Sequence, residues 1–188
     1  MAETAESSDL LRPVRIGIVL SILSILLGFG LGGVFGGFER EAKEFLEKAA
    51  SSVDSSVYAS HETKSKKVIK KAWGYVKRSH MHGGAIGATA LALSLMLAFC
   101  DRSRRFLRGL VAAALGAGSF GYSMYWLLAA IKTARMGSPG PAKASLEWLA
   151  VPSAGLLIVG VVAALALIVR QTFCRCGAKL TAEDETSA

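Results

Sequence analysis

Four long stretches of the chain contain no charged residue, and this pattern predicts four membrane-spanning helices. They cover residues 16–38, 83–100, 109–131 and 148–169, and all 22 basic and 14 acidic residues lie outside them. A helix that crosses the hydrocarbon core of a bilayer needs about 20 apolar residues, within a range of about 17–25. These stretches are apolar on every side, whereas a helix at the surface of a soluble protein has a polar face.

The pattern therefore predicts an all-α integral membrane protein with four transmembrane helices and an amphipathic helical loop between the first two. The first stretch is too long for the apolar part of a cleavable signal peptide and follows acidic residues, so we expect it to remain in the mature protein. The expected segments are a mobile N-terminal tail (1–15), the first span (16–38), a basic extramembrane loop (39–79), the second span (80–100), an arginine-rich hairpin (101–108), the third span (109–131), a loop (132–147), the fourth span (148–169) and a C-terminal tail (170–188).

Four spans place both termini on the same side of the membrane. The number of lysines and arginines favours the side of the loop 39–79 as cytoplasmic, whereas the crowding of four arginines in residues 101–108 favours the side of the termini. We expect the termini to be cytoplasmic.

Glycines four residues apart mark the second half of the first span. This spacing lets two helix backbones approach closely in lipid, so it predicts a packing face toward the bundle or toward a partner. A thin, bendable helix end is the alternative interpretation. The glycines concerned are Gly28, Gly32, Gly33, Gly36 and Gly37.

The loop 39–79 contains two amphipathic patterns, and the second one is strongly basic. In residues 64–78 an apolar stripe at helical spacing is flanked by lysines. A basic amphipathic helix is typical of a helix that lies in the membrane interface, where each lysine gains about 1 kcal/mol near anionic lipid. A docking face for an acidic partner subunit and an ordinary solvated loop are the alternatives. The candidate residues for lipid or partner binding are Lys66, Lys67, Lys70, Lys71, Trp73, Lys77 and Arg78.

The most concentrated group of candidate metal ligands is His80-Met81-His82, at the entry to the second span. Imidazole and thioether groups suit copper or iron. Residues i and i+2 lie about 200° apart on a helix, so a site shared by both histidines requires an unwound chain. The alternatives are two interfacial histidines beside closely packed glycines, or a pH-responsive pair.

This His-x-His motif, followed by a small, leucine-rich span, resembles the motif of small membrane proteins related to the haem–copper oxidase catalytic subunit. The resemblance covers residues 80–99. It implies that His80 or His82 binds haem b or copper; the partner histidines of that family are absent from the other three predicted spans.

The spans contain no Asp, Glu, Lys or Arg, and ion-coupled transporters normally need such groups at depth. No nucleophile elbow, phosphate loop or zinc-protease motif occurs. We therefore expect a non-catalytic accessory or scaffolding subunit of a membrane complex, with membrane lipids and other membrane-protein subunits as partners and no nucleic acid. A haem- or copper-binding protein is the first alternative, and a lipid-binding protein is the second.

Overall fold

The computed structural model describes residues 10–51, 62–100 and 103–185, with side chains described for residues 10–50, 65–100 and 103–173. Every regular element within these ranges is a helix. The helices are α2 (Arg15–Gly37), α3 (Glu39–Ser51), α5 (Glu62–Ala98), α6 (Arg105–Met136), α7 (Pro139–Ala144) and α8 (Glu147–Glu185). The all-α fold predicted from the sequence is confirmed. Most of the expected mobile tail, residues 1–9, lies outside the described ranges.

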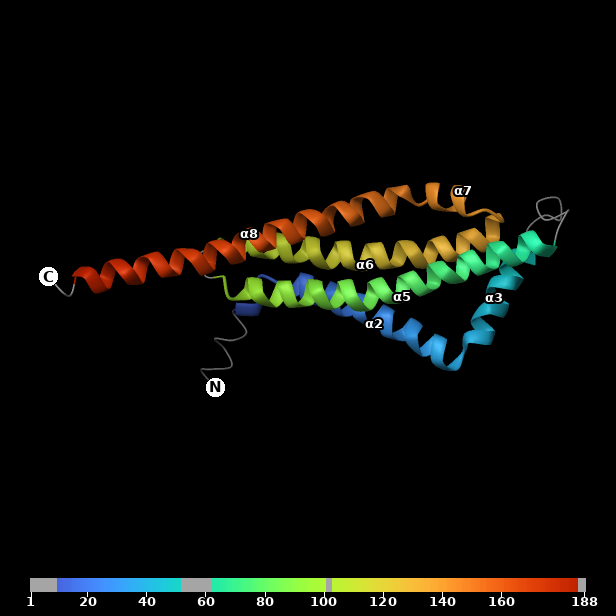
Figure 1. Ribbon diagram of the computed structural model, residues 1–188, viewed down its shortest axis with the longest axis horizontal. Helices are drawn as coiled ribbons and strands as arrows, with labels where there is room; N and C mark the ends of the chain where they lie inside the picture. The colour runs from blue at the N-terminus through green and yellow to red at the C-terminus, as the bar shows by residue number, and fades with distance from the viewer. Residues whose placement is uncertain (1–9, 52–61, 101–102, 186–188) are drawn as a thin grey trace.

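The long helices run lengthwise along an elongated antiparallel bundle (Figure 1). The start of α2 and the end of α8 lie at the same end of the bundle. At the other end, α3 turns back from α2 to reach the N-terminal half of α5, and α7 links α6 to α8. We call this second end, made of α3, α7 and the adjoining parts of α5 and α6, the head.

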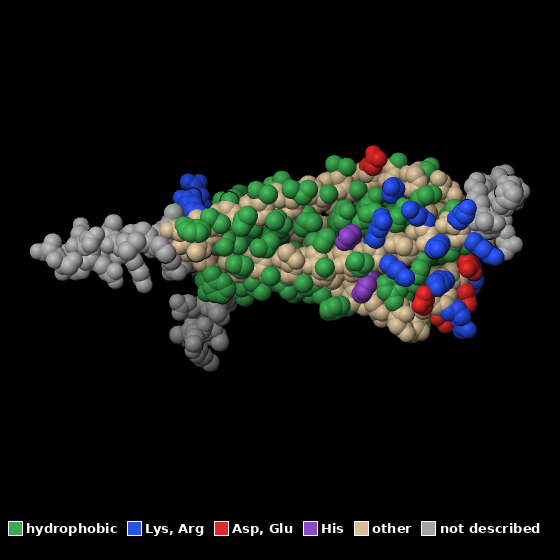
Figure 2. Space-filling model, viewed as in Figure 1, with side chains coloured by type: hydrophobic (Ala, Val, Ile, Leu, Met, Phe, Trp, Pro, Cys, Tyr) green, Lys and Arg blue, Asp and Glu red, His purple; other side chains and the backbone are tan. Residues whose placement is uncertain are grey.

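Three helices within the described chain are long and apolar enough to cross a membrane. They are Arg15–Gly37, Ser65–Ala98 and Glu147–Phe173, and they cover all or nearly all of the first, second and fourth predicted spans. A wide hydrophobic band covers the middle of the molecule, and many Lys and Arg side chains gather over the head (Figure 2). Large apolar side chains such as Phe29, Ile158 and Val162 are more than 60% exposed, as a lipid-facing surface requires.

The third predicted span lies in α6, which is less apolar because it is the central helix. It packs against α2, α5 and α8. The polar residues of its second half point inward, and Ser119 and Ser123 are fully buried. A helix surrounded by other helices can carry hydroxyl groups that a lipid-facing helix would expose to hydrocarbon.

The helix is not interrupted at the boundary expected between the basic loop (39–79) and the second span (80–100). A single helix, α5, continues through it from Glu62 to Ala98. The basic amphipathic segment is thus a direct extension of the span along the axis of the bundle (Figure 1).

Two apolar clusters stabilise the bundle, one at each end. The cluster in the head includes Leu46, Trp73 and Tyr125, from α3, α5 and α6. The opposite cluster includes Val14, Leu97 and Leu115. Between these clusters the helices touch through small residues. Small side chains let the backbones approach closely, so the contact does not depend on interdigitating large side chains.

Candidate functional site

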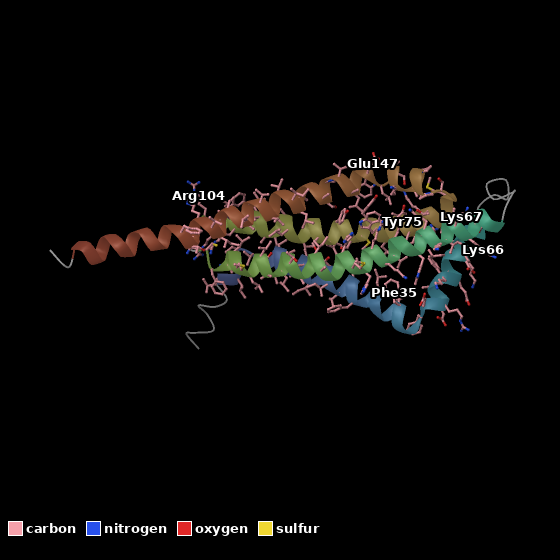
Figure 3. All side chains as sticks on the ribbon, in the orientation of Figure 1. Phe35, Lys66, Lys67, Tyr75, Arg104 and Glu147 are labelled. Carbon is pink, nitrogen blue, oxygen red and sulfur yellow. The ribbon has the colours of Figure 1, made fainter. Side chains whose placement is uncertain are left out.

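The basic residues of α5 form one exposed face on the head, which we call the lysine face. It consists of Lys66, Lys67, Lys70, Lys71, Lys77 and Arg78, and all six side chains are exposed. At 100° per residue these positions fall within an arc of about 140° on the helix. Lys66 and Lys67 lie near the far end of α5, away from the hydrophobic band, whereas Arg104 marks the opposite end of the bundle (Figure 3).

The apolar stripe of the same segment is buried inside the protein. Val68, Ala72 and Val76 are at most 7% exposed and belong to the helix face opposite the lysines. Their burial, together with the contacts of α5 with α3 and α6, means that this stripe is not available to the bilayer. The apolar stripe predicted to lie in the membrane interface is therefore packed inside the protein, and this part of α5 has one packed face and one basic face.

Trp73, a predicted lipid- or partner-binding residue, lies in the core of the head at 8% exposure. Its ring meets Phe35 of α2 edge to face, with 5.1 Å between the ring centroids. The ammonium group of Lys43 on α3 lies 5.4 Å from the Trp73 ring. Trp73 thus joins α2, α3 and α5 and is not part of the lysine face.

The acidic and basic side chains of α3 form exposed ion pairs with one another. Lys43 Nζ lies 2.6 Å from Glu39 Oε1, one helical turn away. This hydrogen bond, and then the positive charge of Lys43, lower the pKa of Glu39 below its ordinary value. Arg40 pairs with Glu41 and Glu44. Glu39, Glu41 and Glu44 are therefore already paired with basic residues of their own helix.

His80 connects α5 with α2. Its Nδ1–H donates to the Gly28 carbonyl oxygen at 2.7 Å. A Cβ atom at Gly32 would lie 2.9 Å from the His80 ring, and Phe35 meets that ring edge to face at 5.2 Å. The glycines of α2 thus make room for an imidazole between the two helices.

His82 faces a different neighbour, the aromatic part of α6. Its ring centroid lies 5.2 Å from that of Tyr122 and 6.2 Å from that of Trp126. The Arg78 guanidinium lies 4.8 Å from the centroid of the Trp126 ring. Figure 2 shows histidine side chains where the hydrophobic band meets the basic head.

The helical course of residues 79–84 keeps His80 and His82 apart, because they contact α2 and α6 respectively. A site shared by both rings needs an unwound chain, and the motif is helical. Met81 is 63% exposed. Within the described residues no group of three or more His, Cys, Asp and Glu side chains is placed to hold a metal ion. Binding of haem or copper by a single histidine stays a prediction from the sequence.

The five predicted packing glycines divide into two groups. A Cβ at Gly28 would collide with the backbone of Gly83 and Gly84, and Gly32 accommodates His80. A Cβ at Gly33, Gly36 or Gly37 would meet nothing within 4 Å, as would one at Gly30. Of these five glycines, Gly28 and Gly32 are therefore the two that pack against the described part of the chain.

A buried serine cluster beside the Gly28–Gly83 crossing was not anticipated from the sequence. Ser119 Oγ donates to Ser24 Oγ at 2.9 Å, and Ser79 Oγ donates to the Ser123 carbonyl oxygen at 2.8 Å. These bonds tie α6 to α2 and to α5. Serines recurring within apolar windows are the signal for such a cluster, but single serines are also common on lipid-facing helices.

Comparison with protein-family models, curated proteins and solved structures finds no match for this chain.

Proposed function

We propose that this protein is a non-catalytic accessory subunit that crosses the membrane four times and holds an acidic partner protein through the lysine face of α5. The observation that carries the proposal is the rigid attachment of this basic face to a membrane-spanning helix. α5 continues from Glu62 to Ala98, and its six basic side chains stay exposed while the opposite face is packed.

The fourth crossing is assigned to α6. Its charge-free stretch, residues 109–131, lies among three helices that are apolar enough to span, and it packs against each of them. The course of α6, lengthwise beside these helices (Figure 1), supports a crossing through the same layer of the membrane. Its inward serines explain its lower hydropathy.

The length of the lysine face along the axis of α5 favours a protein over the lipid surface as its binding partner. Lys66 and Arg78 are separated by about 18 Å along the helix axis, at a rise of 1.5 Å per residue. Electrostatic attraction is largely screened beyond about 8 Å at physiological ionic strength. In the proposed arrangement α5 lies along the membrane normal, so only the basic groups nearest the membrane span come within that distance of the lipid headgroups. An acidic face of a folded protein can contact the full length.

Charge reversal tests the proposal in native membranes. Lys67, Lys70 and Lys71 are replaced together by glutamate, and the complex is extracted in mild detergent and sized on a native gel. We expect wild type to migrate in an assembly larger than the detergent-bound monomer. The triple variant should migrate mainly as a monomer, because its glutamates would face the acidic groups of the partner and repel them.

The control reverses charge on other helices of the head, at Arg135 of α6 and Lys143 of α7, which are also exposed. This variant should stay in the assembly. A wild-type protein that migrates as a monomer, or an assembly that survives reversal of the lysine face, contradicts the proposal.

A further inference from the structure

A groove at the end of the bundle opposite the head combines two arginines with apolar walls. It has a volume of about 490 Å³ and lies between the turn before α2 and the first turns of α6. Arg12 comes from that turn and Arg105 from the start of α6. The walls include Ile16, Phe106 and Leu110.

Close backbone packing brings the two arginines to the same groove. A Cβ at Gly109 would lie 2.7 Å from the Pro13 carbonyl oxygen, so the turn before α2 rests directly on α6. Val14, next in the chain, is fully buried in the adjoining apolar cluster. The groove is therefore part of the packed structure and not a chance gap between loose segments.

The chemistry of the groove is that of a lipid with a charged head. Guanidinium groups bind phosphate oxygens through paired hydrogen bonds, which a lysine cannot reproduce with the same geometry. Phe106, Ile16 and Leu110 are 80%, 57% and 56% exposed, so hydrocarbon is their natural cover in a membrane. A soluble anion would use the arginines and leave these walls in water.

We infer that this groove is a binding site for one anionic phospholipid. The phosphate lies between Arg12 and Arg105, and an acyl chain lies along Ile16, Phe106 and Leu110. The site is independent of the proposed partner surface, because the lysine face occupies the other end of the molecule (Figure 3).

The test uses the full chain purified in a neutral detergent, with phosphatidylglycerol and phosphatidylcholine as probes and native mass spectrometry as the measurement. Wild type should retain one phosphatidylglycerol in preference to phosphatidylcholine. Replacement of Arg12 and Arg105 together by glutamine should weaken phosphatidylglycerol binding about tenfold, because two charge-assisted contacts are lost. The control, Arg15→Gln with Arg104→Gln, removes the same charge from neighbouring exposed positions outside the groove and should change little.

Three results would overturn the inference: equal retention of the two lipids, equal weakening by the two double variants, or competition by inorganic phosphate at millimolar concentration. Circular dichroism of each variant in phosphatidylcholine checks that the helices are intact. If the double variant unfolds, Arg12→Gln carries the test by itself, because Arg12 lies in the turn outside the helix and is exposed. Failure here leaves the acidic-partner proposal standing, since the lysine face is unchanged.

Discussion

At the scale of single residues, two glycines on α2 separate the effect of close packing from that of helix propensity. Gly28→Ala places a methyl group against the backbone of Gly83 and Gly84, which must move. Gly33→Ala makes the same chemical change in open space. We expect Gly28→Ala to lower the free energy of unfolding by about 1–3 kcal/mol and Gly33→Ala to raise it by roughly 0.5–1 kcal/mol. Thermal unfolding in detergent, followed by circular dichroism, measures both; changes of the same sign would show that the α2–α5 crossing is looser than described.

Arg108 provides a second test at this scale because it is a buried charge. It is 5% exposed, and its Nη1–H donates to the Ala98 carbonyl oxygen at 2.8 Å. A cation at the C-terminal end of a helix satisfies a carbonyl that the helix leaves free and also opposes the helix dipole. Arg108→Ala should lower the free energy of unfolding by about 1.5–3 kcal/mol. Arg104→Ala, at an exposed position, should change it by less than about 0.5 kcal/mol.

These residues also show what a linear pattern leaves undecided. The four-residue spacing of the glycines predicts close packing somewhere on α2. Gly28 packs against α5, whereas a Cβ at Gly33 or Gly37 would meet no atom of the described chain within 4 Å. Spacing identifies a helix face, and only the neighbours decide which part of that face is covered. His80 and His82 lie in the same motif and on the same helix, yet their rings meet α2 and α6. The sequence identified both histidines as candidate residues, but it could not predict which helix each ring contacts.

At the scale of elements, the continuity of α5 makes a distance prediction. Spin labels are attached at Lys67→Cys and Met81→Cys, both exposed, in a chain whose three native cysteines are replaced by serine. A continuous helix separates these two positions by about 21 Å along its axis. Double electron–electron resonance should therefore give a narrow distribution near that value. Gly74→Pro, which interrupts the helix between the labels, should broaden it; a broad distribution without proline would mean that the head is hinged.

The serine cluster predicts a coupling between α2 and α6. The bond from Ser119 Oγ to Ser24 Oγ is buried and 2.9 Å long. A double-mutant cycle with alanine at both positions should give a coupling of about 0.6 kcal/mol, the average for hydrogen bonds between membrane helices. The same cycle between Ser24 and Ser153, which packs against Gly121 on the other side of α6, should give a coupling near zero. A null result for the first pair would assign the α2–α6 contact to backbone packing alone.

Helix propensity and periodicity predicted the elements better than their surroundings. The stripe of Val68, Ala72 and Val76 correctly indicates a helix with one buried face. That face packs on protein and not on lipid, and an apolar stripe has the same spacing in either case. The serines and tyrosines of α6 lower its mean hydropathy. A membrane-spanning helix can carry them because they point into the bundle. An amphipathic pattern shows which side of a helix avoids water. Whether protein or lipid covers that side depends on segments that are distant in the sequence.

At the scale of the whole molecule, the four-span arrangement predicts that the head and the arginine-rich end lie on opposite sides of the membrane. Arginines at 102, 104, 105 and 108 crowd next to two span ends, and positive charge close to a span favours the cytoplasmic side. In the cysteine-free chain, Gly140→Cys on α7 should react with an impermeant thiol reagent in intact cells. Arg104→Cys should react only after permeabilisation. The reverse result would invert the orientation and keep the four spans, whereas labelling of both sites from one side would exclude an arrangement in which α5, α6 and α8 all cross.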